Sequence, residues 1–130
     1  RQTIDRCPDA MWDDAADKSK VWYVTHHVLF YTHLYLSDTE KDFKRWTGEK
    51  PEGQPYTRAE VLEYLAFCQQ LVAEKVPHLN LEAESGFFWL PFNKLELQIY
   101  NIRHLQQHTG ELYERLGTRA GIEFDWVSTK

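Results

Sequence analysis

Three histidines on two predicted helices are the residues of this chain whose type and spacing could do chemistry. His104 and His108 are four residues apart in LELQIYNIRHLQQHTGELYERL, so on a helix their imidazoles rise from successive turns of one face and can share a metal ion. His27 lies in the apolar segment KVWYVTHHVLFYTHLYLS. If His27 faces the pair, three imidazoles hold the ion and one coordination position stays open, as in a reactive rather than a closed structural metal centre.

The spacing of His104 and His108 is by itself a weak signal. We expect the main apolar stripe of their helix to run through Ile102, Leu105, Leu112 and Leu116. At about 100° per residue, the two histidines lie roughly 80 to 100° from the centre of that stripe, on the shoulder of the buried face. A solvent-exposed pair of histidines without a metal is therefore the simpler interpretation of this helix alone.

The other histidines differ in how well they fit a ligand role. His27 lies within the most apolar helix, where an unpaired imidazole is costly to bury, although Tyr23 or Tyr31 one turn away could supply a hydrogen bond instead of a metal. His26 is a plausible substitute ligand, and we expect both His26 and His33 to be partly exposed packing residues. We expect His78, which follows a proline in a loop, to be solvated.

Glu111 follows His108 by three residues and allows two interpretations. Its carboxylate can accept a proton from a ligand histidine and so orient the imidazole. It can equally pair with Arg115 on the surface at the favourable spacing of four residues, which is the interpretation that we prefer from the sequence.

Length and composition indicate one globular domain over residues 1–130, with 42% hydrophobic and 15% aromatic residues. The net charge of −5 argues against nucleic-acid binding, and no apolar run approaches the roughly 20 residues that cross a membrane. Cys7 and Cys68 are far apart and form no CxxC motif, so we expect no disulfide and a cytoplasmic location, with Cys68 as part of the core. No signal peptide is visible, and a removed segment before Arg1 stays an open alternative.

Three long helices are predicted. The first covers about residues 19–37 and is apolar almost all round, as a buried central helix is. The second begins at a capping box of Thr57 and Glu60 and ends before Pro77. The third begins at a similar capping box of Asn93 and Glu96 and ends before Gly117. The inward positions of the second helix are expected to be Val61, Leu65, Cys68, Val72 and Val76.

The remaining segments complete an all-α prediction. Residues 1–12 resemble the last turns of a helix that breaks at Pro8, residues 78–92 form an irregular aromatic connection, and the tail 121–130 is expected to pack on the outside. A four-helix bundle whose first helix is cut at its N-terminus fits this element order best, and a three-helix bundle is the alternative.

Three stretches resemble motifs of the DinB-like (DinB/YfiT) superfamily. H-V-L-F-Y-x-x-L-Y-L from His27 to Leu36 is similar to that family's second-helix motif, and P-Y-T-R-A-E-V-L-E-Y-L from Pro55 to Leu65 is similar to the start of its third helix. The last-helix motif N-x-R-H-x-x-x-H resembles L-E-L-Q-I-Y-N-I-R-H-L-Q-Q-H-T-G-E-L from Leu95 to Leu112. The departures are the truncated first helix and His33, which stands where a carboxylate is expected.

The resemblance implies a four-helix bundle of up-down-down-up topology. It also implies a divalent metal, such as Zn²⁺, Ni²⁺ or Fe²⁺, held by His27, His104 and His108 and completed by water. Members of the family are often homodimers. No organic cofactor is implied, and no further catalytic residue is assigned.

The chemistry expected from this resemblance is metal-dependent. The ion would activate a thiol or water, with a small-molecule thiol or electrophile as the partner, in an S-transferase that uses low-molecular-weight thiols or in a hydrolase. The alternative is a non-enzymatic, stress-associated binding or interaction module whose metal is structural or adventitious. A third possibility is a helical scaffold in which the histidines never meet.

Overall fold

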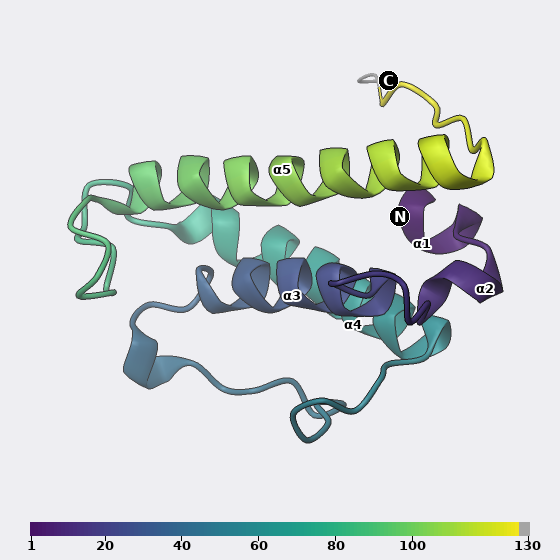
Figure 1. The fold of residues 1–130 in the computed structure, drawn as a ribbon. Helices are drawn as coiled ribbons and strands as arrows, with labels where there is room; N and C mark the ends of the chain where they lie inside the picture. Colours follow the sequence, from purple (N-terminus) through teal and green to yellow (C-terminus); the bar gives the residue numbers. More distant parts are fainter. Residues whose placement is uncertain (128–130) are drawn as a thin grey trace.

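The computed structural model describes residues 1–127, and this part of the chain is all-α (Figure 1). Two short helices are followed by three long ones: α1 Gln2–Arg6, α2 Asp9–Trp12, α3 Val21–Leu34, α4 Arg58–Lys75 and α5 Lys94–Ala120. Turns of 3-10 helix occur at Glu40–Asp42 and Val76–His78. Within the described residues the only β pairing is an isolated bridge between Glu84 and Asn93. None of the described helices is long and apolar enough to cross a membrane.

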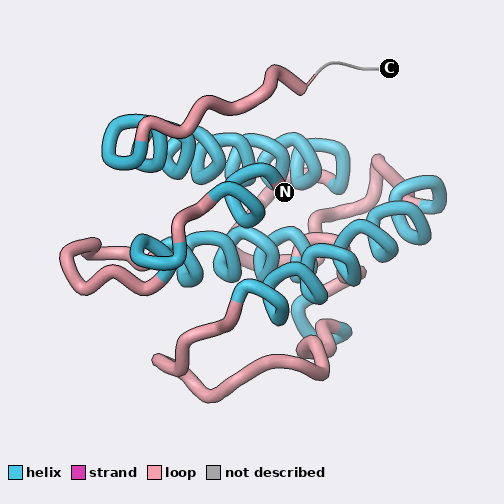
Figure 2. Tube along the Cα trace, turned by 90° about the vertical axis from the view of Figure 1, so that its right-hand side faces the viewer, coloured by secondary structure: helices cyan, strands magenta, loops and turns pink. Residues whose placement is uncertain are grey.

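The three long helices lie side by side and differ in direction. Helices α3 and α4 run the same way and α5 runs opposite to both (Figure 1). Two parallel helices cannot be joined by a tight turn, so the 35–57 segment returns along the molecule before α4 begins. Helix α3 contacts both α4 and α5, which confirms it as the central helix. After α5 the chain turns back along that helix, as Figure 2 shows from a second side.

Both predicted capping boxes form. The side chains of Thr57 and Asn93 accept from the backbone N–H of Glu60 and Glu96, and the two glutamates bond back to the cap residues. Helix α5 continues past its predicted end at Gly117 and stops at Gly121, whose φ of 65° favours glycine. The extra turn is held by Arg119, which binds Asp14 at 2.5 Å and Asp17 at 2.6 Å in the loop before α3.

Described segments near both ends of the chain are packed against the helices. The N-terminal helix breaks between α1 and α2 at Pro8, as predicted. In the tail, the Phe124 ring stacks on Tyr113 with ring centroids 4.0 Å apart, and the backbone N–H of Asp125 donates to Gln2 Oε1 at 2.8 Å. The prediction that the tail packs on the outside is confirmed for residues 121–125, whereas Trp126 and Val127 are exposed and residues 128–130 lie outside the described part.

The apolar core is divided into two clusters. The larger one joins α1, α2, α3 as far as Leu29, α4 as far as Cys68 and the end of α5 with Leu112 and Leu116, and Cys68 is a free cysteine. The smaller one consists of Leu34, Tyr35, Phe87, Leu90 and Leu97. Along the inner face of α5, the residues between the two clusters are Asn101, His104 and His108.

The predicted apolar stripe of α5 is wrong in its N-terminal part. Ile102 is 55% exposed and Leu105 is 39% exposed, although Leu112 and Leu116 are buried as expected. Hydrophobicity alone selects an apolar stripe, but the real inner face of α5 is polar in its middle because His104 and His108 point towards α3 there. The inner face is formed by Leu97, Asn101, His104, His108, Leu112 and Leu116. The histidines therefore lie at its centre rather than on its shoulder.

Helix α4 is buried on its inner face only as far as Cys68. Val61 and Cys68 are buried as predicted, but Val72 is 39% exposed and Val76 is 45% exposed. The reason is length: α4 has 18 residues and runs parallel to the 14 residues of α3, so its last turns extend past the end of its neighbour. Lys94 fixes α5 beyond that end, because its buried ammonium donates to the carbonyls of Ser37 at 3.0 Å and Asp38 at 2.6 Å.

Candidate metal centre

The structure brings together the three histidines predicted as ligands. His27 lies in the second turn of α3 and faces His104 and His108 in the middle of α5. The Nε2 atoms of His27 and His104 are 3.2 Å apart. One ring nitrogen from each of the three side chains lies within 4.8 Å of the other two. The third possibility considered from the sequence, that the histidines never meet, is therefore wrong.

The nitrogen positions can be compared with the needs of a divalent ion. A tetrahedral ion bound at about 2.0–2.1 Å to two imidazole nitrogens holds those nitrogens about 3.3 Å apart. The 3.2 Å separation of the His27 and His104 Nε2 atoms agrees with this value. Three imidazole nitrogens from two helices are also a donor set that Zn²⁺, Ni²⁺ and Fe²⁺ all accept. The residues present fit such an ion.

The protonation state of the cluster suits metal binding. Burial lowers the pKa of His104 to about 4, and the charges of His108, His27 and Arg103 act in the same direction. Burial also lowers the pKa of His27, with a further lowering from His108 and an opposing effect of Glu111. Both rings are therefore neutral at pH 7, which is the form that donates a lone pair to a metal.

Glu111 fulfils both interpretations considered from the sequence. Its Oε2 lies 3.0 Å from Nδ1 of His108, and its Oε1 accepts from Arg115 Nη2 at 2.6 Å. Arg115 also donates to the Ser19 carbonyl at 2.5 Å, which ties the carboxylate to the loop before α3. A carboxylate on Nδ1 keeps the proton there and leaves the Nε2 lone pair of His108 free for an ion.

The first prediction concerns this carboxylate. Glu111→Ala should weaken Zn²⁺ or Co²⁺ binding by about 10- to 100-fold, because the partner that fixes the ring and tautomer of His108 is lost. Competition titration against a chelator of known affinity measures the change. Glu114→Ala is the matched control, since Glu114 is exposed on the same helix and bonds to Thr118. Equal affinities of the two variants would contradict the role given to Glu111.

The remaining histidines stand apart from this cluster. His26 stacks on Tyr56 with centroids 4.1 Å apart, and its Nε2 is buried without a hydrogen-bond partner. His33 is 5% exposed and its Nδ1 lies 3.1 Å from the Tyr64 hydroxyl, so the expectation that it is partly exposed is wrong. The cause is α4, whose Tyr64 covers this side of α3. His78 is exposed, as predicted.

The second prediction follows from His26. Burial lowers the pKa of His26 to about 4, and the neighbouring His27 adds to this shift. The folded pKa lies below the unfolded value near 6.5, so the unfolded chain takes up the proton first as the pH falls. The contribution of neutral His26 to the free energy of unfolding is therefore complete above about pH 6.5 and is lost as the pH falls towards 4. Because the ring is partly exposed, we expect this loss to be only about 1 kcal/mol.

Urea unfolding at pH 7.5 and pH 4.5 in the presence of a chelator measures this loss. His26→Phe, which keeps the stacking on Tyr56, should lose less stability over this interval than the parent chain. His78→Phe at an exposed position is the control and should behave as the parent does. The same loss in all three proteins would place the acid sensitivity elsewhere.

An open pocket of about 510 Å³ adjoins the histidines. Two of the three, His27 and His104, line it together with Tyr31, Tyr35, Trp89 and Tyr100. Apart from Tyr31, which was considered as a hydrogen-bond partner of His27, these aromatic residues were not predicted near the site, although the spacing of two of them is a signal. Tyr31 follows His27 by four residues and Tyr100 precedes His104 by four, so each shares a helix face with its histidine.

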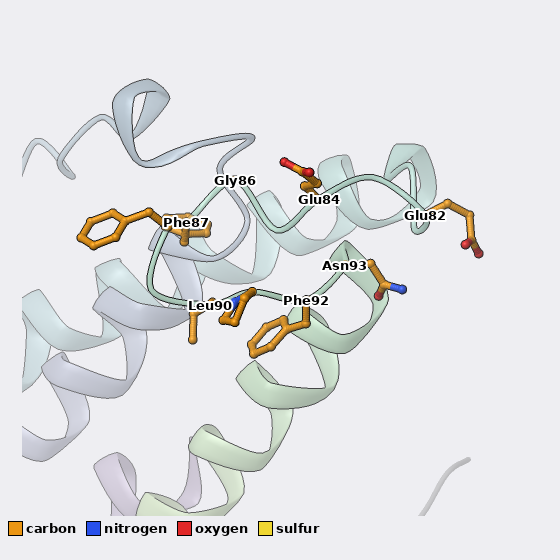
Figure 3. A pocket seen from close by; sticks show the side chains of 9 residues that line it. Glu82, Glu84, Gly86, Phe87, Leu90, Phe92 and Asn93 are labelled. Carbon is orange, nitrogen blue, oxygen red and sulfur yellow. The ribbon is translucent and has the colours of Figure 1, made fainter.

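A further hollow lies on the 82–93 loop and has no part in this site. It is lined by residues of that loop, Glu84 and Phe92 among them, and contains no histidine (Figure 3). The carboxylates of Glu82 and Glu84 point away from the loop (Figure 3). This hollow has a volume of about 570 Å³, so size alone does not identify the site, and the gathered donor nitrogens do.

In comparisons with known proteins, no family model, no curated protein and no solved structure matches this chain. Function therefore has to be inferred from the site itself.

Proposed function

We propose that this chain is a divalent-metal-binding protein in which His27, His104 and His108 hold the ion, and that it is a metal-dependent enzyme that activates a thiol or water. The observation that carries the proposal is the meeting of three histidine nitrogens within 4.8 Å, two of them on the wall of an open pocket. Three ligands and an adjoining space are what a reactive centre requires.

A divalent ion at this place would supply Lewis acidity, which lowers the pKa of a coordinated thiol or water towards neutrality. Residues of the chain keep the histidines in the form that binds an ion. Glu111 holds the proton on Nδ1 of His108, and burial keeps His27 and His104 neutral. Transfer of a thiol to a small electrophile is the reaction that we propose first, and hydrolysis is the second. Imidazole donors alone do not select among Zn²⁺, Ni²⁺ and Fe²⁺.

The proposal includes a DinB-like four-helix arrangement of up-down-down-up topology. It is supported by the parallel course of α3 and α4, by the opposite course of α5, and by the position of α1 and α2 beside the larger core cluster. Cytoplasmic location and a homodimer belong to the same proposal. The exposed Leu95 and Ile99, four residues apart on one face of α5, support a contact with a second copy, because neighbouring exposed apolar side chains favour association.

The rival candidate, a non-enzymatic module with a structural or adventitious metal, requires a site closed to small molecules. The pocket of about 510 Å³ beside His27 and His104 favours the enzyme over this module.

Metal analysis of the purified chain tests the proposal, and this is the third prediction. We expect about one divalent ion per chain and a melting temperature that falls by roughly 10 °C on addition of a chelator, since an ion bound only to the native state at about a thousand times its Kd stabilises it by about 4 kcal/mol. A metal-free protein that binds no added Zn²⁺, Ni²⁺ or Fe²⁺, with an unchanged melting temperature, would overturn it.

A further inference from the structure

We propose that the pocket beside His27 and His104 is a substrate site selective for an uncharged aromatic molecule. The inference rests on the proposed function only in that the ligand's reactive end would lie at the histidine cluster. The class of ligand follows from the pocket walls, which belong to three separate segments of the chain.

Aromatic rings form most of the pocket wall. Tyr31 and Tyr35 come from α3 and its end, Tyr100 comes from α5, and Trp89 comes from the loop between α4 and α5. The ring centroid of Tyr35 lies 5.5 Å from that of Tyr31 and 5.8 Å from that of Tyr100. Rings at such distances present faces and edges on which a flat apolar molecule packs favourably.

The described residues of the wall also include no Lys, Arg, Asp or Glu side chain. Its other members are Leu34 and the two histidines. Burial, with smaller effects of Tyr100 and Tyr31, raises the pKa of Tyr35 to about 12, so this side chain is a neutral hydroxyl. Arg103 is the nearby cation: it is exposed and lies over the Tyr100 ring at 5.2 Å, but it is not part of the wall. Away from the ion itself, an anionic group buried against this wall would have no cationic side chain as a partner.

A second pocket on the other side of His27 has a different character. This pocket of about 470 Å³ contains both signs of charge, with Arg45, Glu49, Lys50 and Glu52 at its edge. Arg45 is paired with Glu49, and Lys50 is paired with Glu60 outside the pocket. Of these two pockets, only the one of about 510 Å³ therefore combines aromatic rings with a wall free of charged side chains, so we place the uncharged molecule in that pocket.

Three probes of the Co²⁺-loaded protein test the inference: imidazole, 4-phenylimidazole and 4-(imidazol-4-yl)benzoate. Visible absorption reports ligation of the ion. We expect 4-phenylimidazole to bind at least about tenfold more tightly than imidazole, because its phenyl group leaves water for the aromatic wall. The benzoate should lose most of this gain. Equal affinity of imidazole and 4-phenylimidazole, or tighter binding of the benzoate than of 4-phenylimidazole, would overturn the inference.

A pair of adjacent loop residues supplies the matched variants. Trp89→Ala removes part of the wall and should reduce the preference for 4-phenylimidazole over imidazole by about threefold or more, whereas Phe88→Ala, at an 89% exposed position outside the wall, should not. An equal effect of the two substitutions would count against the assignment of the wall.

Failure of the metal proposal is separable from failure of this one. In metal-free protein, the chemical shift of the Trp89 indole N–H should still respond to 4-phenylimidazole, and its resonance is assigned by its disappearance in Trp89→Ala. If the protein binds no Co²⁺ but shows this response, the aromatic site is supported and the metal centre is refuted. If the protein binds Co²⁺ without preferring the aryl probe, only the aromatic site is refuted.

Discussion

Alanine at His27, His104 or His108 should each reduce the affinity for Zn²⁺ or Co²⁺ by at least about 100-fold, because each substitution removes one of three protein ligands. This is the largest effect that we expect on binding. It is measured by metal content after dialysis and by competition titration. The three variants should lose metal affinity to a similar degree, since the two remaining imidazoles hold an ion only weakly.

His78→Ala is the control for these substitutions, because His78 is exposed and lies outside the cluster. In the presence of a chelator, the melting temperatures of all four variants should lie close to that of the parent chain, since the three cluster side chains are only partly buried. Full retention of metal after substitution of both His27 and His108 would refute the assignment of the ligands.

The largest effect on stability should come from the end of α5. Leu116→Ala is expected to lower the free energy of unfolding by about 2–5 kcal/mol, because Leu116 is fully buried in the larger core cluster and its removal leaves a cavity. Ile102→Ala, on the same helix but 55% exposed, should change it by no more than about 0.5 kcal/mol. Urea unfolding with added chelator measures both.

This comparison also tests which face of α5 is buried. The stripe expected from the sequence places Ile102 and Leu116 on one inward face, and equal losses in the two variants would support that arrangement over the one described. A loss confined to Leu116 supports a helix whose inner face carries the histidines.

Local signals in the sequence predicted the helices well. The capping boxes at Thr57 and Asn93 and the break at Pro8 depend on groups within a few residues of one another, so the sequence contains all the required information. The end of α5 was harder to predict because Arg119 extends the helix through partners about a hundred residues away.

The candidate site was predicted in its residues but not in its surroundings. The spacing of His104 and His108 and the place of His27 in an apolar helix are visible in the sequence, whereas the direction in which a helix presents its face depends on the neighbouring helix. Hydrophobicity therefore placed His104 and His108 on a shoulder, and it placed His33, which is buried against Tyr64, on a partly exposed face. The aromatic wall combines α3, α5 and the loop that contains Trp89, a combination that only the tertiary structure supplies.

The division of the core into two clusters has a consequence for how such a protein can evolve. The residues between the clusters are polar, and most of the apolar burial that holds α5 lies on either side of them. Substitutions at the histidines therefore act on chemistry at little cost to folding, while those within the larger cluster act on folding and leave the chemistry alone. Such a partition eases the usual conflict between acquiring a new activity and staying folded, so the same helical frame can serve different reactions.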